Sequence, residues 1–489
     1  MLYLLMTFPL IGFECGQAQV GQGSSTSQVN SNLGHSFNTD LLGQSASHMF
    51  QVTIPDEDLK SKLKALNIPA LRFPGGTGSN FYHFYEKGYG FKEEDIRLSK
   101  GYPPYDKLMV RLEKEKGLID KGFTAENYAF RFADLAIDLN SPIVLVLNIF
   151  SGSDNENLDL IRFFEGKGIE IKGLELGNEN YFRSFASEFP DAHEYMNRCK
   201  KLTMKIKREF PHLKVAVTAA NAPSDTYKGL EERFRAWNRV VSSFDFYDAA
   251  VVHFYSKTPQ CDQLEDIEER FQCATKQSLE NANDWLNEGL DYYGKTFSDV
   301  PLWLTEYNVK EVYKYYGNTL YQTLYNAHLL LNLLDDERVD LATYHVLYTY
   351  SYGFAMLSKR KDGAKERVAY NLFKMMAEMD DTFNKVEEQE WINTNQKIDV
   401  SIWYSQEKNN YQAFVLNFDK ISKEYSPLTT SGKVHFKGFY GENLVAGQGQ
   451  NPYRDNEYLN EIKTFDEIIE GNKITIRPYS FSKITWSGP

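Results

Sequence analysis

The sequence has few cysteines, no long apolar run and a deficit of positive charge. None of its four cysteines forms a Cys-x-x-Cys pair, so we do not expect a zinc site built from thiolates. No internal run approaches the roughly 20 apolar residues that cross a bilayer, so no transmembrane segment is predicted. Lys and Arg number 54 against 67 Asp and Glu, and the net charge of −13 argues against nucleic acid as the main partner.

Two further patterns are missing. No internal repeat is evident, which argues against a solenoid or a propeller. No glycine-rich dinucleotide fingerprint follows an early strand, and residues 75–78 (GGTG) lack its spacing, so no nucleotide cofactor is expected. The chain is instead rich in aromatic residues, with 32 Tyr and 33 Phe. Aromatic rings suit the apolar faces of a sugar, although an aromatic-rich core explains the composition at least as well.

The amino-terminal residues are typical of a secreted protein. Residues 1–13 form a short apolar run, and the small-x-small triplet Gly16-Gln17-Ala18 follows as a cleavage pattern, although no positively charged residue precedes the run. We therefore predict a signal peptide over 1–18 and a secreted or periplasmic protein. Cys15 also allows an outer-membrane lipoprotein, but Glu14 before it fits that pattern poorly. Residues 19–44 are expected to form a linker that can add a strand to a β-sandwich.

Three cysteines remain after such a cleavage. Cys261 and Cys273 lie close together in one polar segment and can form a disulfide in an oxidising compartment, which spacing alone leaves open. Cys199 lies on a predicted helix and is expected to be a buried free thiol.

Short apolar runs alternate with amphipathic stretches, the pattern of parallel βαβ units. Strands are predicted at 70–73, 143–147, 173–176, 215–218, 249–253, 302–305 and 341–344, with an earlier one within 33–48. Helices are predicted at 56–66, 124–139 (capped by Thr124), 191–209, 228–243, 279–293, 320–334 and 366–379. Eight strand–helix repeats over about 340 residues favour an α/β fold of the (β/α)8 barrel type over an open doubly wound sheet.

The pattern changes after about residue 385. Segments 398–404, 411–418, 433–437 and 473–486 alternate like strands of an antiparallel sandwich, and no long helix is predicted among them. We therefore expect a catalytic barrel at 45–385 and a β-sandwich domain at 386–489.

Two glutamates follow barrel strands directly. Glu179 lies in 177–180 (GNEN) and Glu306 in 305–308 (TEYN), each where a predicted strand ends. Reactive groups of such barrels sit at these carboxyl ends, and two carboxylates across one cleft are what glycosidic bond cleavage requires. A lone glutamate at a strand end is more often a cap or an ion-pair partner, but two at opposed positions favour catalysis.

Other polar side chains end neighbouring strands. A guanidinium at Arg72 can keep a carboxylate ionised, although a structural ion pair fits its position equally. Hydrogen bonds to substrate are expected from the remaining strand-end residues, which are Asn148, Asn178, His253, Tyr255, Tyr307 and His345.

Four motifs resemble retaining glycoside hydrolases of clan A, and most of all the alpha-L-arabinofuranosidase and heparanase (beta-glucuronidase) type. They are 71–76 (LRFPGG), 175–179 (ELGNE), 252–255 (VHFY) and 303–306 (WLTE), and the resemblance spans most of 40–350 in the same order. That family pairs a (β/α)8 barrel with a β-sandwich and needs no metal or cofactor.

The resemblance also implies roles for individual residues. Glu179 would be the acid/base and Glu306 the nucleophile. Asn178 would contact the sugar 2-hydroxyl, Arg72 would brace Glu306, and His253 or Tyr255 would border the nucleophile. The usual Asn-Glu-Pro is Asn-Glu-Asn in this chain, which weakens assignment to any one family.

Residues 77–123 form a long excursion after the second barrel strand, full of Tyr, Phe and Lys. Such a segment either shapes the cleft or packs on the side of the barrel. The positively charged residues of this segment either bind an anionic glycan or form a solvent-exposed loop face. They are Lys87, Lys92, Arg97, Lys100 and Lys107. The expected substrate is a plant or algal polysaccharide or its oligosaccharides.

Two other function classes compete with this one. A non-catalytic carbohydrate-binding protein on the same barrel would lack one of the two glutamates, and neither is missing. A metal-dependent hydrolase would need clusters of His and Asp at the strand ends, which His253 and His345 alone do not supply.

Overall fold

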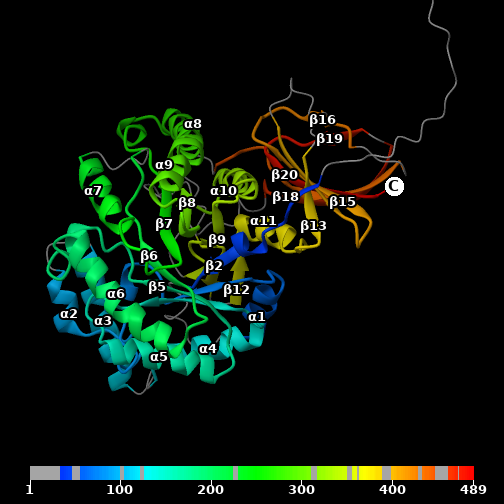
Figure 1. Cartoon of the computed structure of the whole chain (residues 1–489). Coiled ribbons are helices and arrows are strands. Elements are labelled where there is room, and N and C mark those ends of the chain that lie inside the picture. The colour runs from blue at the N-terminus through cyan, green and yellow to red at the C-terminus, as the bar shows by residue number, and fades with distance from the viewer. Residues whose placement is uncertain are drawn as a thin grey trace, which may run out of the picture.

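A computed structural model describes residues 33–46, 56–99, 104–121, 126–223, 229–309, 317–349, 355–360, 363–387, 398–427, 432–445, 461–471 and 473–488. The predicted signal segment 1–18 with Cys15, residues 19–32 of the predicted linker, Lys100 and Thr124 lie outside these ranges. Figure 1 shows a barrel ringed by helices beside an antiparallel sheet drawn in orange and red.

Eight parallel strands close into a barrel, as the alternation of strands and helices predicted. They are β2 (Gly43–Ser45), β3 (Leu71–Phe73), β4 (Ile143–Leu147), β5 (Ile171–Leu176), β6 (Val215–Thr218), β7 (Ala249–Ser256), β8 (Leu302–Val309) and β9 (Val339–Tyr344). Helices cover the outside of the barrel, so its strands are buried on both faces, and β4 in particular is a continuous apolar run in which every residue is buried.

The outer helices mostly match their predicted positions. They are α1 (Glu57–Lys64), α4 (Tyr128–Leu139), α5 (Asp154–Gly166), α6 (Ala192–Glu209), α7 (Glu231–Val241), α8 (Ile267–Asp284), α9 (Leu290–Thr296), α10 (Leu320–Leu333) and α11 (Val368–Met376). The prediction omitted α5, which Ser153 caps by accepting from the Glu156 backbone N–H. It also placed the start of α4 too early, because Asn127 caps that helix and accepts from the Ala129 backbone N–H.

Two regions differ further from the prediction. The helix predicted at 279–293 is a longer unit, in which α8 and α9 are joined by a π-helical turn, η6 (Trp285–Gly289). Between β9 and α11 lies an unpredicted three-stranded sheet of β10 (Tyr348–Thr349), β11 (Leu357–Arg360) and β12 (Gly363–Glu366). The excursion after β3 contains η3 (Thr77–Phe81), α2 (Glu93–Leu98) and α3 (Pro104–Asp120).

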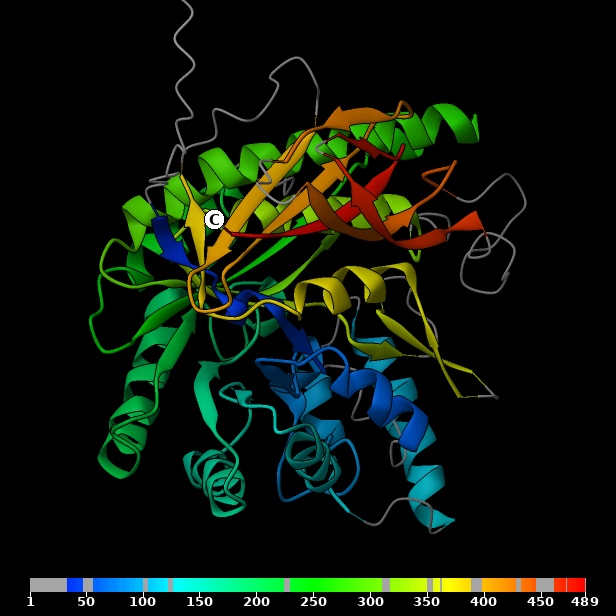
Figure 2. The ribbon, with the colours of Figure 1, turned by 90° about the vertical axis from the view of Figure 1, so that its right-hand side faces the viewer.

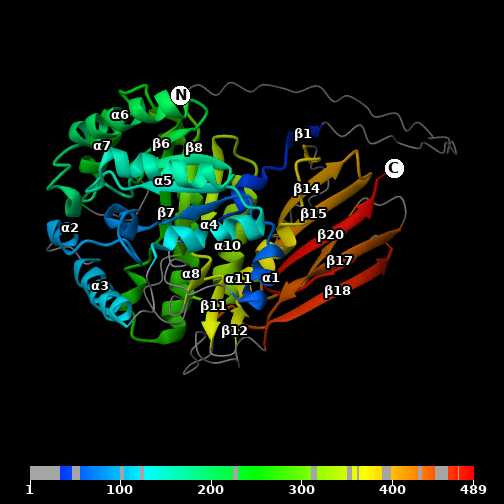
Figure 3. The ribbon, with the colours of Figure 1, turned by 90° about the horizontal axis from the view of Figure 1, so that it is seen from below.

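The carboxyl-terminal part is an antiparallel sheet of seven strands in the order β1-β13-β14-β15-β20-β17-β18, drawn at the right of Figure 3. These strands are β1 (Leu33–Ser36), β13 (Phe383–Val386), β14 (Asp399–Ser405), β15 (Asn410–Asn417), β17 (Lys433–Tyr440), β18 (Lys463–Glu470) and β20 (Ser480–Ser487). Strand β1 comes from the amino-terminal segment and pairs with β13. The strand predicted at 473–486 is broken at Pro478-Tyr479, since proline lacks an N–H and Tyr479 has a φ of 40°.

Each face of this sheet packs against a different layer. On one face, strands β16 (Lys423–Tyr425) and β19 (Ile474–Ile476) pair with each other, and their apolar side chains share a buried cluster with Phe436 and Ile484. The two layers therefore form a small sandwich. On the other face, Trp403, Phe414 and Phe481 join the main core, and α10 contacts β15 and β20. In Figure 2 the orange and red strands lie next to the yellow helix α11.

No helix in the described ranges is both long and apolar enough to cross a membrane.

Candidate active site

The two predicted catalytic glutamates lie at the carboxyl ends of β5 and β8. Glu179 follows β5 in a turn whose backbone is left-handed at both Gly177 (φ 82°) and Glu179 (φ 49°). A Cβ at Gly177 would lie 2.0 Å from Asn180 Oδ1, so this turn requires glycine there. Glu306 belongs to the last half of β8, and its strand pairs it with His253 of β7.

Positive and hydrogen-bonding groups surround the Glu306 carboxylate. Arg72 Nη1 donates to Oε1 at 2.7 Å and the Tyr255 hydroxyl donates to Oε2 at 2.8 Å. His253 Nδ1 and His345 Nδ1 each lie 3.8 Å from Oε2. Burial opposes ionisation of Glu306, but the charges of His253, His345 and Arg72 outweigh it and hold the pKa of this carboxyl well below its usual range. The carboxylate is therefore charged at neutral pH, the state that a nucleophile requires.

Arg72 is completely buried and its guanidinium has four hydrogen bonds. Nε and Nη2 donate to the two oxygens of Glu175, each at 2.8 Å, and Nη2 also donates to Asn178 Oδ1 at 2.9 Å. Burial disfavours the charge on Arg72, but Glu175 and Glu306 raise its pKa above the usual value. Glu175 thus holds the guanidinium in the orientation in which Nη1 reaches Glu306. Sequence reasoning did not single out Glu175, although a glutamate within a buried strand needs such a cationic partner.

Glu179 shares a neighbour with Glu306. His253 Nδ1 lies 3.2 Å from Glu179 Oε1 and 3.8 Å from Glu306 Oε2, so these two oxygens are at most about 7 Å apart. The Tyr181 hydroxyl lies 3.3 Å from Glu179 Oε1 and donates to Asn221 Oδ1 at 2.7 Å. The Glu179 side chain is 18% exposed and that of Glu306 is 7% exposed, so Glu179 is the more accessible of the pair.

The structure brings most of the other predicted residues to this end of the barrel. Asn178 is held by Asn80, which accepts from its backbone N–H at 3.0 Å and donates to its carbonyl at 2.6 Å. The side-chain Nδ2 of Asn178 is buried and has no acceptor among the described residues. His345 is held beside Glu306 because Asn308 donates to its carbonyl at 2.7 Å.

Asn148 and Tyr307 are placed differently. The Asn148 amide donates to the Tyr82 carbonyl and to Ser151 Oγ, each at 3.1 Å, so it connects two loops. Tyr307 is fully buried, and its ring packs edge-on against Tyr344 with centroids 5.9 Å apart. Successive side chains of a strand point to opposite sides, so Tyr307 points away from the side on which Glu306 lies. A shift of register at Thr305 decides which of the two residues faces the cleft, and simple alternation along the sequence does not reveal it.

The excursion after β3 packs on the barrel through its aromatic residues. Phe81 contacts Phe150 edge-on at a centroid distance of 5.5 Å, and Phe84 stacks on Phe130 at 6.2 Å. Its cations are partly neutralised, since Arg97 pairs with Glu93 and Lys92 with Glu86.

A buried histidine fixes the start of this excursion. His83 lies between two carboxylates, with Nδ1 2.9 Å from Glu156 Oε2 and Nε2 2.5 Å from Asp95 Oδ2. Burial opposes the charge on His83, but Asp95 and Glu156 raise its pKa to about 8. The ion pairs therefore attach α2 and the preceding loop to α5.

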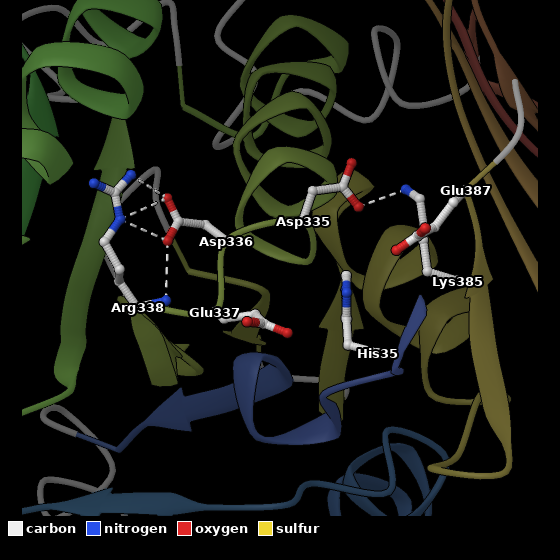
Figure 4. A pocket seen from close by; sticks show the side chains of 7 residues that line it. All are labelled: His35, Asp335, Asp336, Glu337, Arg338, Lys385 and Glu387. Atoms are coloured by element: carbon white, nitrogen blue, oxygen red, sulfur yellow. Dashed lines mark hydrogen bonds and ion pairs between the residues drawn. The ribbon is translucent and has the colours of Figure 1, made fainter. Parts of the chain in front are cut away.

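A separate pocket lies at the opposite end of the barrel (Figure 4). It is formed where the segment before β9 meets β1 and β13, and its lining residues are His35, Asp335, Asp336, Glu337, Arg338, Lys385 and Glu387. Lys385 pairs with Asp335, and Arg338 pairs with Asp336 at 2.6 Å. Because these residues precede β9, the pocket is remote from the carboxyl ends of the strands and from the two glutamates.

The structure also shows the state of the three cysteines that lie in the barrel. Cys261 and Cys273 form a disulfide in the segment after β7, and Cys199 is a buried free thiol on α6.

The sequence matches no family model and no curated protein. Among solved structures, the chain is similar to the alpha-L-arabinofuranosidase from Thermotoga maritima, with a TM-score of 0.66 and 17% identity over 94% of this chain and 98% of that one. It is similar to AbfB, a family 51 alpha-L-arabinofuranosidase from Bifidobacterium longum, with a TM-score of 0.63 and 13% identity over 94% and 98%. It is also similar to BuGH86 in complex with neoagarooctaose, with a TM-score of 0.58 and 10% identity over 94% and 78%. The chain thus has the fold of these clan A glycoside hydrolases, a (β/α)8 barrel with a carboxyl-terminal β-sandwich, which confirms the fold that the sequence motifs predicted.

Proposed function

We propose that the protein is a retaining glycoside hydrolase that cleaves a plant or algal polysaccharide or its oligosaccharides. The observation that carries this proposal is that the carboxylates of Glu179 and Glu306 lie 3.2 Å and 3.8 Å from the same nitrogen, His253 Nδ1, with Glu306 held in its charged form. Their two nearest oxygens are at most about 7 Å apart, and this distance is compatible with the separation of about 5–5.5 Å between the carboxyl groups of retaining enzymes.

The proposed mechanism has two displacement steps. Glu179 donates a proton to the glycosidic oxygen while the Glu306 carboxylate attacks the anomeric carbon, which forms a glycosyl ester and releases the leaving-group sugar. Glu179 then accepts a proton from water, the water oxygen attacks the anomeric carbon, and Glu306 leaves as a carboxylate. Two inversions give net retention. Arg72 and Tyr255 stabilise Glu306 whenever it carries its charge, and Asn178 Nδ2, which has no acceptor among the described residues, is available for the sugar 2-hydroxyl.

Two features support export of the protein. The predicted signal peptide precedes the described residues, and disulfides such as Cys261–Cys273 form and persist mainly in oxidising compartments. Fractionation of the source cells, with amino-terminal sequencing of the mature protein, tests this part of the proposal. An uncleaved protein in the cytosol would contradict it.

The test of the activity is a screen of chromogenic arabinosides, glucuronides, galactosides and xylosides beside algal polysaccharides, with the product anomer followed by NMR. We expect hydrolysis with retained configuration, loss of turnover in Glu306→Ala, and sugar binding by that variant. Tyr307→Phe is the matched control, because Tyr307 is the next residue of β8 and points away from Glu306. Undiminished turnover in Glu306→Ala, or product of inverted configuration, would overturn the mechanism. Sugar binding without turnover of any substrate would instead favour a carbohydrate-binding protein.

A further inference from the structure

Two arginines close to Glu179 form no ion pair with any residue that the structure describes. Arg183 belongs to η4 (Arg183–Phe185), four residues after Glu179, and Arg233 belongs to the first turn of α7. Neither forms an ion pair with a described residue, although this acidic chain pairs many of its other arginines, such as Arg97, Arg162 and Arg338.

Arg233 is attached to the segment that carries the proposed acid/base. Its Nε donates to the Tyr181 carbonyl at 3.0 Å, and the Tyr181 hydroxyl lies 3.3 Å from Glu179 Oε1. Its Nη2 atom is buried and has no hydrogen-bond acceptor among the described residues. A buried donor on a charged group without an acceptor is unfavourable, so an acceptor supplied from outside would be bound favourably.

The two guanidinium groups also influence each other. Burial and, after it, the charge of Arg183 lower the pKa of Arg233, and no carboxylate counters this effect. Arg183 itself is exposed. Because like charges repel, an anion placed between the two would relieve the repulsion and satisfy the free donor. The planar donor array of arginine suits carboxylate and sulfate oxygens.

The position in the barrel indicates which sugar such an anion would belong to. Arg183 and Arg233 follow β5 and β6, whereas the groups that hold Glu306 come from β3, β7 and β9. Under the proposed function, Glu179 protonates the glycosidic oxygen, so residues on its side that are remote from Glu306 face the leaving-group sugar.

We propose that Arg183 and Arg233 bind an anionic substituent, a carboxylate or a sulfate, on the leaving-group side of the scissile bond, so that the substrate is an acidic glycan. This inference rests on the proposed function for the direction of the substrate. It assigns the anion site to the loop after Glu179, not to the lysine-rich excursion considered from the sequence.

Calorimetric titration of the non-hydrolysing Glu306→Ala variant tests the inference. The probes are an oligogalacturonate for the carboxylate, a sulfated carrageenan oligosaccharide for the sulfate, and a neutral agarose oligosaccharide. We expect at least one acidic probe to bind more tightly than the neutral one, with an affinity that falls at least tenfold in Arg233→Gln or Arg183→Gln and decreases with added salt. The acidic probe that responds identifies the anion.

The control is Arg235→Gln, which removes the same charge from the same helix, α7, at a position whose guanidinium lies over the Tyr292 ring. It should leave the affinity unchanged. Because Arg183 is exposed, its replacement should fold normally even if Arg233→Gln does not. Failure of both acidic probes to bind, binding of the neutral probe with equal affinity, or equal losses in the control would overturn the inference. These outcomes are separate from failure of the proposed function, which would appear as absence of turnover of every substrate by the wild-type protein.

Discussion

The Tyr255 hydroxyl offers a sensitive test of how Glu306 is kept charged. It donates to Glu306 Oε2 at 2.8 Å, and this hydrogen bond stabilises the carboxylate but not the neutral acid. A hydrogen bond to a charged group contributes about 1.5–3 kcal/mol, and one pKa unit corresponds to about 1.4 kcal/mol. Tyr255→Phe removes the bond and keeps the buried ring. We therefore expect the pKa of Glu306 to rise by about one to two units.

The sign of this change determines the assay. In the wild-type protein the pKa of Glu306 lies below its usual range, so the nucleophile stays ionised down to acidic pH. A raised pKa means that Glu306 becomes protonated, and activity is lost, at a higher pH. The acid limb of the kcat/KM profile should thus move upward by about one to two units. Arg72, His253 and His345 remain, so Glu306 stays ionised near neutral pH, and the loss of activity there should be much smaller than the loss on the acid limb itself.

Tyr307→Phe is the matched control for this experiment. Tyr307 is also a buried tyrosine, but its hydroxyl has no hydrogen-bond partner among the described residues. Its removal should leave the acid limb in place. The reasoning is refuted if the acid limb of the kcat/KM profile of Tyr255→Phe lies at the same pH as in the wild type, or if both variants shift this limb equally.

Three further predictions concern stability. Glu175→Gln breaks the completely buried ion pair with Arg72, so thermal unfolding should show that the free energy of unfolding falls by about 3–5 kcal/mol. An unchanged Tm would contradict a stabilising role of this ion pair. The Cys261→Ala/Cys273→Ala variant should lose about 2–4 kcal/mol, and dithiothreitol should lower the Tm of the wild type but not that of the variant. The pKa of His83 is raised from 6.5 to about 8, so its contribution of about 2 kcal/mol is present in full below pH 6.5 and is lost as the pH rises through 8. His83→Gln should abolish this loss in denaturant titrations at pH 6 and pH 9, and an identical pH dependence in wild type and variant would argue against it.

The barrel could be predicted from the sequence because its strands are buried on both faces. Runs such as 143–147 (IVLVL) are apolar throughout and stand out between amphipathic helices. Strand β2 (Gly43–Ser45) does not stand out, because its three residues are small or polar and only pairing with β3 and β9 makes it a strand. The edge strand β18 is exposed along most of its length and therefore lacks an alternating pattern.

The residues of the candidate active site that lie at the ends of barrel strands could be predicted from the sequence. The carboxyl ends of parallel strands meet at one rim, so Arg72, His253 and Glu306 could be expected together from their positions alone. The resemblance implied the contact of Arg72 with Glu306, but the contact of Arg72 with Glu175 could not be predicted, because 175–179 contains two glutamates and local spacing does not reveal which one meets a cation from another strand. Arg233 was missed for a similar reason, since its contact with Tyr181 joins residues 52 positions apart.

The pairing of β1 with β13 has a consequence for how the chain can be divided. Residues 33–36 complete a sheet whose other strands all come after residue 382, while the whole barrel is encoded between them. During translation this sheet stays unfinished until the last strands leave the ribosome, long after its first strand was made. A truncation at residue 385 would leave β1 bonded to a lone strand, and a fragment that begins there would lack β1 and the first half of β13, so β14 would lose most of its pairing with that strand. Neither half is a natural expression unit, so the two parts are expected to unfold in one cooperative transition.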